Sequence, residues 1–140
     1  MDPLSISASI AGLLSIAGAT AATLDALFRD FKSRPAVLSA ISQEISALRL
    51  VLGQLEGQLR SPNSEENEKV LSAVLDLCMQ AFQQIGSQIN ELQSKLRKGP
   101  LSKAYTFMLY PSRMKEISGL RDDLEKYKLT LLIALQMHKP

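Results

Sequence analysis

The sequence of 140 residues contains no tryptophan, one cysteine and one histidine. A single cysteine excludes an internal disulfide framework and a zinc site built on several cysteines. Aromatic residues make up only 5% of the chain, and leucine, isoleucine, alanine and serine dominate. This composition favours packed helices over a β-sandwich. The formal net charge of +2 is too small to indicate a protein that binds nucleic acid.

The sequence also lacks the motifs by which many enzymes are recognised. It has no glycine-rich phosphate loop, no His-Glu-x-x-His pair and no nucleophile elbow. His138 stands near the C-terminal end of the sequence, and Cys78 falls on an apolar helical stripe, as a buried structural thiol does. We therefore expect no catalytic residue, no cofactor, no bound metal and no small-molecule substrate.

Apolar residues recur at helical spacing in four segments, which predicts helices over about 2–31, 34–59, 65–97 and 111–136. The segment 101–110 is predicted as a short helix or an ordered connector, because its aromatic and apolar residues need burial. We expect an all-α, antiparallel four-helix bundle, or five helices if that connector is itself helical. Residues 1–140 are expected to form a single domain, the N-terminal module of a longer protein.

The first predicted helix is unusual because residues 3–24 carry no charge. These 22 residues span about 33 Å as a helix, close to the roughly 30 Å of a bilayer's hydrocarbon core. The only early charge is acidic, which argues against a signal peptide. The strongly apolar residues of the segment are Leu4, Ile6, Ile10, Leu13, Leu14, Ile16 and Leu24. They favour insertion by roughly 2–4 kcal/mol, and the intervening serine, threonine and glycine residues reduce this, so the segment is a marginal membrane helix.

Small residues in this segment stand four apart, namely Ala8 with Gly12 and Gly18 with Ala22. Such rows allow two helices to approach closely, either in a bundle core or in a membrane oligomer. One interpretation is a central helix covered by the other three. The other is a membrane-active helix, and both hold if the helix is sheltered in one state and released in another.

Two groups of basic residues are candidates for contacts with anionic lipid headgroups. Arg29, Lys32 and Arg34 follow the uncharged segment, and Lys95, Arg97 and Lys98 end the third predicted helix. The alternative is that both groups are solvated helix ends.

The opening residues Met-Asp-Pro-Leu-Ser-Ile-Ser-Ala-Ser-Ile-Ala-Gly-Leu-Leu-Ser-Ile-Ala-Gly (1–18) resemble the start of a large set of fungal N-terminal domains. These precede NOD-like receptor modules or ankyrin repeats, or accompany short amyloid signalling motifs. The set includes the HeLo-like domains, which are related to the HeLo domain of the HET-S incompatibility protein. The resemblance extends to the uncharged first helix, the Ile/Leu stripe of the second helix and the leucine-rich last helix.

The resemblance implies a cell-death effector domain of fungal innate immunity or heterokaryon incompatibility. Such a bundle is cytoplasmic and inactive until it is clustered, and its N-terminal helix then permeabilises the plasma membrane. On this sequence the membrane-active segment is 4–24, and the expected partners are anionic lipids and further copies of the chain. The alternative is a helical oligomerisation or adaptor module that transmits signals by protein–protein contact without touching lipid.

Overall fold

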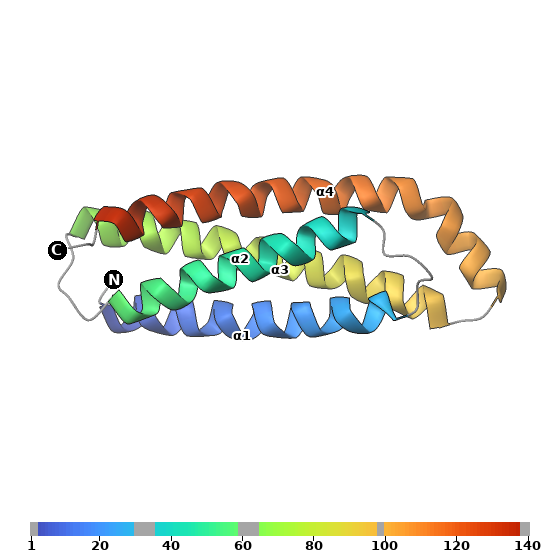
Figure 1. Cartoon of the computed structure of the whole chain (residues 1–140), viewed down its shortest axis with the longest axis horizontal. Coiled ribbons are helices and arrows are strands. Elements are labelled where there is room, and N and C mark those ends of the chain that lie inside the picture. Colours follow the sequence, from blue (N-terminus) through green and yellow to red (C-terminus); the bar gives the residue numbers. More distant parts are fainter. Residues whose placement is uncertain (1–2, 30–35, 59–64, 98–99, 138–140) are drawn as a thin grey trace.

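The computed structural model describes residues 3–29, 36–58, 65–97 and 100–137, with side chains at 6–29, 36–58, 68–94, 112 and 114–136. Every described residue except Arg29 lies in one of four helices. These are α1 (Pro3–Phe28), α2 (Ala36–Gln58), α3 (Glu65–Arg97) and α4 (Pro100–Met137), drawn in Figure 1. The predicted all-α fold with four helices is confirmed. The bounds of the first three helices agree with prediction to within about three residues.

The prediction of a separate connector at 101–110 is wrong, because α4 runs without interruption from Pro100 through Pro111 to Met137. A proline inside a helix removes one backbone hydrogen bond, and its ring meets the carbonyl group four residues earlier. A helix usually bends at such a point. In Figure 1 the first part of α4, drawn in orange, is inclined to the rest of the helix.

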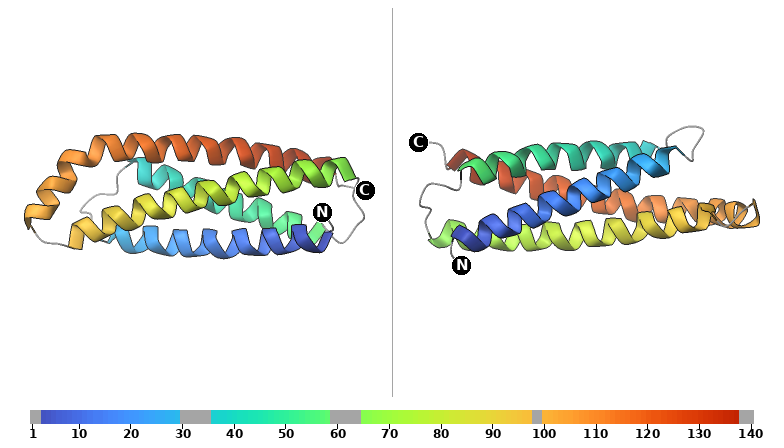
Figure 2. Two further views of the ribbon diagram at one scale, coloured as in Figure 1. Left: turned by 180° about the vertical axis from the view of Figure 1, so that it is seen from behind. Right: turned by 90° about the horizontal axis from the view of Figure 1, so that it is seen from below.

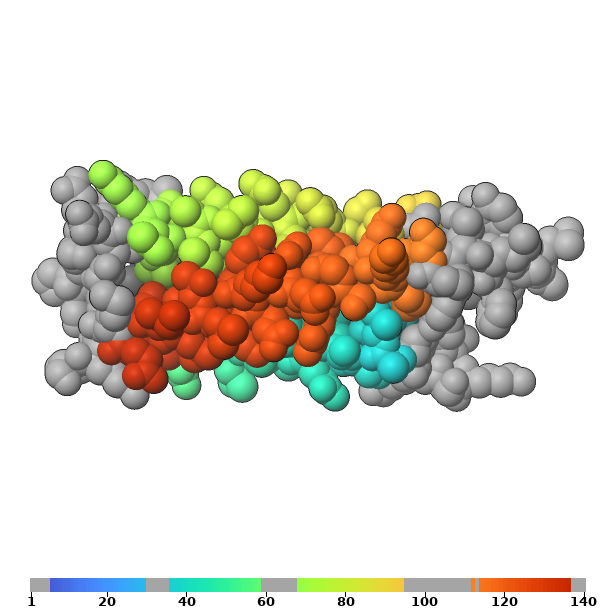
Figure 3. All heavy atoms as spheres, turned by 90° about the horizontal axis from the view of Figure 1, so that it is seen from above, coloured from blue at the N-terminus to red at the C-terminus, as the bar shows by residue number. Residues whose placement is uncertain are grey.

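The four helices alternate in direction and form a square (Figures 1 and 2). Among the described residues, α1 contacts α2 and α3, and α4 also contacts α2 and α3. Figure 3 shows α4 flanked by α3 on one side and by α2 on the other. The pairs α1–α4 and α2–α3 therefore lie on the diagonals, and α1 runs parallel to its neighbour α3.

The core consists of the apolar stripes that the three-and-four spacing predicts. The α2 stripe is fully or almost fully buried at Leu38, Ile41, Ile45, Leu48, Leu52 and Leu55. The α3 stripe is buried at Leu71, Leu75, Cys78, Phe82, Ile85, Ile89 and Leu92. From α4, Ile117, Leu124, Leu131 and Leu135 are buried, and Leu120, Tyr127 and Ala134 pack against them in part. The predicted core is confirmed at these positions.

One charged residue interrupts this apolar interior. Glu44 on α2 is only 6% exposed, and its Oε1 lies 2.8 Å from Nζ of Lys128 on α4. The two side chains form an ion pair between the helices. Because a buried charge without a partner is costly, this pair holds α2 and α4 in one register.

We predict that Lys128→Met destabilises the bundle by about 3 kcal/mol, because it leaves the Glu44 carboxylate buried without a cation. The double change Glu44→Leu with Lys128→Met removes both charges and restores most of the stability. Urea unfolding of the wild type, both single variants and the double variant measures the coupling energy as a double-mutant cycle. Additive effects of the two changes would mean that the ion pair does not link the helices.

We also predict that Gly53→Ala in α2 and Gly119→Ala in α4 each stabilise the protein by about 0.5–1 kcal/mol. Both glycines lie inside helices, and a Cβ atom added at either has no heavy atom within 4 Å. Thermal unfolding followed by circular dichroism at 222 nm measures the gain. A lower melting temperature for either variant would mean that the glycine has a structural role.

Candidate membrane-active helix

Helix α1 has two unlike faces, of which the inner one is part of the core. The inner residues are at most 6% exposed and are Ile6, Ile10, Leu13, Ala17, Thr20, Leu24, Leu27 and Phe28. They recur at three- and four-residue spacing, so they form one stripe along the helix. This stripe packs against α2 and α3.

The structure places most of the predicted membrane-active residues inside this core. Ile6, Ile10, Leu13 and Leu24 are fully buried, and Leu14 and Ile16 are partly buried against the same cluster. The side chain of Leu4 lies outside the described residues. In this state the apolar face of α1 is therefore sheltered by the other helices, and an action on lipid remains a prediction.

The opposite side of α1, here called the outer stripe, consists of Ala8, Ala11, Ser15, Ala19 and Ala22, all exposed. The stripe presents no charge to solvent over about 21 Å of helix. The interpretation of α1 as a central helix covered by the other three is therefore wrong. The helix occupies a corner of the square, with two neighbours and an open side.

The predicted close-packing residues do not bring helices together inside this bundle. Ala8 and Ala22 belong to the outer stripe. A Cβ atom added at Gly12 would lie 3.8 Å from Cε of Met79 on α3, and one at Gly18 would lie 3.8 Å from Nη2 of Arg49 on α2. Both distances are ordinary contacts, so neither glycine is required by its neighbour. Packing through these residues in an oligomer remains a prediction.

The threonine hydroxyl groups of α1 are satisfied within the helix itself. Thr20 Oγ1 donates to the carbonyl oxygen of Ile16 at 2.8 Å, and Thr23 Oγ1 donates to that of Ala19 at 3.0 Å. These bonds depend on no other helix. They persist if α1 moves as an intact helix, which reduces the penalty for these hydroxyl groups in an apolar surrounding.

Of the predicted headgroup contacts, Arg29 is exposed just after the end of α1. Lys95 and Arg97 lie in the last turn of α3, where the described structure gives the backbone only. Lys32, Arg34 and Lys98 lie outside the described residues. Because α1 and α3 run in parallel, the ends of both helices, with Arg29 and Arg97, lie at the same end of the bundle.

A groove runs between α1 and α3, and every residue that lines it is uncharged. The lining residues are Ile16, Ala19, Thr20, Thr23, Phe82, Gln83, Gly86, Ser87, Ile89 and Asn90. The groove continues the charge-free surface of the outer stripe through Ala19. The uncharged character of α1 is therefore shared by the neighbouring surface of α3.

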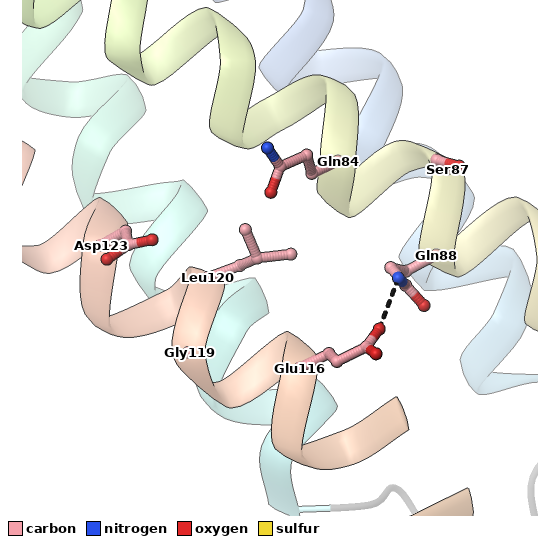
Figure 4. A pocket seen from close by; sticks show the side chains of 7 residues that line it. All are labelled: Gln84, Ser87, Gln88, Glu116, Gly119, Leu120 and Asp123. Carbon is pink, nitrogen blue, oxygen red and sulfur yellow. Dashed lines mark hydrogen bonds between the residues drawn. The ribbon is translucent and has the colours of Figure 1, made fainter. Parts of the chain in front are cut away.

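A second groove, between α3 and α4, is polar. Figure 4 shows Gln88 Nε2 donating to Glu116 Oε2, at 2.6 Å, across the two helices. Asp123 also lines this groove, and Leu120 points from α4 toward α3. Within the described side chains, no three His, Cys, Asp or Glu residues gather in a group that would hold a metal ion. The expected absence of a catalytic or metal site remains a prediction.

Cys78 is buried, as the apolar stripe predicts. Burial raises the pKa of its thiol to about 12, because the thiolate loses its hydration there. The thiol therefore stays protonated and unreactive at neutral pH.

The sequence alone did not identify the Glu44–Lys128 pair. A signal was present, because Glu44 directly precedes Ile45 and stands three residues after Ile41 on a helix whose apolar stripe is wide.

Comparison with known proteins gives a family but no further relative. No curated protein and no solved structure matches the chain. One family model matches almost the whole sequence, over residues 1–139. On that match, the chain belongs to the family described as "Pigment biosynthesis cluster protein PigL N-terminal".

Proposed function

We propose that this chain is a membrane-targeting, cell-death-inducing effector domain whose helix α1 inserts into or permeabilises the plasma membrane after oligomerisation. The observation that carries the proposal is that α1 is uncharged on every side from Ile6 to Leu24, although only its inner stripe is covered. A helix that only closes a core has no need of an uncharged outer face. The opening residues 1–18, which resemble those of HeLo-like domains, support the cell-death role.

Length and composition support α1 as the inserting helix. Two helical segments, Ile6–Phe28 and Ala36–Gln58, are long and apolar enough to cross a bilayer on these criteria alone. The second is α2, which carries Glu44 in an ion pair with Lys128. Moving α2 into lipid would break this pair and place a carboxylate in hydrocarbon, at a cost of a few kcal/mol. In α1 the acidic residue of the segment is Asp25, which is exposed and lies in the last turn of the helix, and residues 3–24 before it carry no charge.

The corner position of α1 also supports its release. Helix α4 contacts both α2 and α3, so these two helices remain connected when α1 leaves. A single α1 gains too little from insertion to remain in the bilayer alone, as its marginal apolarity indicates. Several copies with small-residue stripes pack against one another in the bilayer, which supplies the missing stabilisation. The domain is accordingly cytoplasmic at rest and moves to the plasma membrane when clustered.

We predict that a short, reducible bis-methanethiosulfonate cross-link between Gly12→Cys on α1 and Met79→Cys on α3 abolishes membrane permeabilisation. A Cβ atom at position 12 would lie 3.8 Å from Cε of Met79, so the linker has to replace the reach of the methionine side chain. The cross-link holds α1 in the core. Leakage of a self-quenched dye from vesicles containing phosphatidylserine should fall at least tenfold when the pair is cross-linked, and should recover on addition of dithiothreitol.

Cys78→Ala belongs in every protein of this experiment, so that the new pair alone reacts. The single variant Gly12→Cys is the matched control, and mass spectrometry establishes that the cross-link has formed. Leakage should also rise more steeply than in proportion to protein concentration, because insertion requires several copies. Equal leakage from the cross-linked and the reduced protein would refute the release of α1.

The second candidate function is an oligomerisation or adaptor module that acts by protein–protein contact. The observation that favours it is a pair of large apolar side chains one turn apart on α4, with Leu129 53% and Ile133 62% exposed. Neighbouring apolar side chains of this kind are typical of contact surfaces between proteins.

For this second function we predict that Leu129→Gln with Ile133→Gln weakens self-association in the absence of lipid by about tenfold or more, without lowering the melting temperature. The matched control is Leu50→Gln on α2, because Leu50 is 71% exposed. Analytical ultracentrifugation measures the association. An unchanged sedimentation profile in the double variant would exclude α4 as the contact surface.

A further inference from the structure

The charges of the chain are distributed unequally between the two ends of the bundle. At one end, α1 and α3 finish and α2 and α4 begin (Figure 1). We call this the cationic end and define it by Arg29, Lys95, Arg97, Lys103, Arg113 and Lys115. The acidic residues in the same helix ends are Asp25, Glu91 and Glu116, and Glu116 is hydrogen-bonded to Gln88.

The opposite end is more evenly balanced. Helix α2 finishes there with Glu56, and α3 begins there with Glu65, Glu66, Glu68 and Lys69, while the last turns of α4 carry Lys126 and Lys128. The excess of positive charge is therefore concentrated at the cationic end.

Helix dipoles explain only part of this arrangement. The glutamates that open α3 and the cations that close it lie where the dipole favours them. Lys103 lies in the first turn of α4 or just after it, where a cation is unfavourable, and that turn contains no acidic residue. Folding alone does not account for cations at this position, whereas an anionic partner does.

The composition of the cationic end indicates which anionic partner it fits. The part of α4 before Pro111 contains Tyr105, Phe107, Met108, Leu109 and Tyr110 together with Lys103. Ala36, the first residue of α2, lines one hollow with Ser118 and Arg121 of α4. The part of α4 that precedes Ser118 therefore extends past the start of α2 (Figure 1). Tyrosine, apolar residues and cations in one segment are typical of the headgroup region of a membrane.

We propose that the bundle docks on anionic membranes by its cationic end, with its long axis directed away from the bilayer. This inference rests on the proposed membrane function and adds the orientation of the bundle relative to the bilayer. The end of α1 marked by Arg29 is then at the headgroups, and its first residues are about 39 Å away. Helix α1 inserts by turning about its C-terminal end, and Arg29 remains on the side from which the protein came, as cations flanking membrane helices do.

The first test compares two variants of equal formal charge. Lys103→Glu with Lys115→Glu reverses two positive charges at the cationic end. Lys69→Glu with Lys126→Glu reverses two positive charges outside it, on α3 and α4. Each lysine near an anionic surface is worth about fivefold in binding, so loss of two predicts partitioning about 30-fold weaker or more. Cosedimentation with vesicles of phosphatidylcholine containing 30% phosphatidylserine measures it. The control variant should bind the vesicles no more than about threefold more weakly than the wild type, which is a third of the expected effect on a logarithmic scale.

The outcomes separate the inference from the proposed function. If both variants bind equally while leakage still depends on the release of α1, the docking inference is wrong and the proposed function stands. If the wild-type protein neither binds nor permeabilises these vesicles, both are wrong. Binding to a DNA duplex or heparin in place of vesicles would also overturn the inference, because it would show a different anionic partner. Circular dichroism verifies that both variants are folded.

The second test measures the orientation directly. A fluorophore is attached at Ser112→Cys, near the cationic end, or at Gly57→Cys, near the opposite end; both positions are exposed. Cys78 is buried and does not react in the folded protein. Lipids with a nitroxide on the headgroup should quench the label at position 112 at least threefold more than the label at 57. Equal quenching, or stronger quenching at 57, would overturn docking by the cationic end.

Discussion

The cover that α1 gives to the apolar stripes of α2 and α3 is the contact on which the rest of the molecule depends. Buried leucine, isoleucine and phenylalanine side chains are each worth about 1.5–3 kcal/mol, and α1 contributes six of them to the core. On entering a bilayer, α1 exchanges one apolar surrounding for another, so its own burial is largely kept. The cost of release therefore falls on α2 and α3, whose stripes lose their cover. Any mechanism for this domain has to cover those stripes again or offset their exposure.

In the proposed release, charge distinguishes α1 from α2. Residues 3–24 are uncharged, so no side chain in this range forms an ion pair with another helix. Its threonine hydroxyls bond within the helix. Helix α2 is comparable to α1 in length and apolar character, but the Glu44–Lys128 pair ties it to α4. The two helices are thus similar in hydropathy. They differ in that removal of α2 from the bundle would separate a buried ion pair, whereas removal of α1 would not.

The sequence was sufficient to predict where the helices lie and which face of each helix is buried. The spacing of Leu38, Ile41 and Ile45 specifies the buried face of α2, because side chains three and four apart share a face. Such spacing does not specify which helices are neighbours, since each stripe is compatible with several partners. The corner position of α1 and the exposure of Ala8 and Ala22 were therefore inaccessible from periodicity. The start of the last helix was wrongly placed at Pro111, because a proline is common in the first turn of a helix but also occurs at a bend inside one.

The gathering of cations at one end, in contrast, needed no coordinates. Four helices that alternate in direction bring the α1–α2 and α3–α4 connections to the same end, whatever their order around the square. This arrangement joins the charge distribution to the uncharged helix. The C-terminal end of α1 is continuous with the chain that leads to α2, so α1 can turn about that end without separating from the bundle. When the same end is held at a membrane, the pivot lies at the bilayer surface. In the proposed release, α1 then has only to rotate about this pivot, and its apolar stripe enters lipid first at the C-terminal end of the helix.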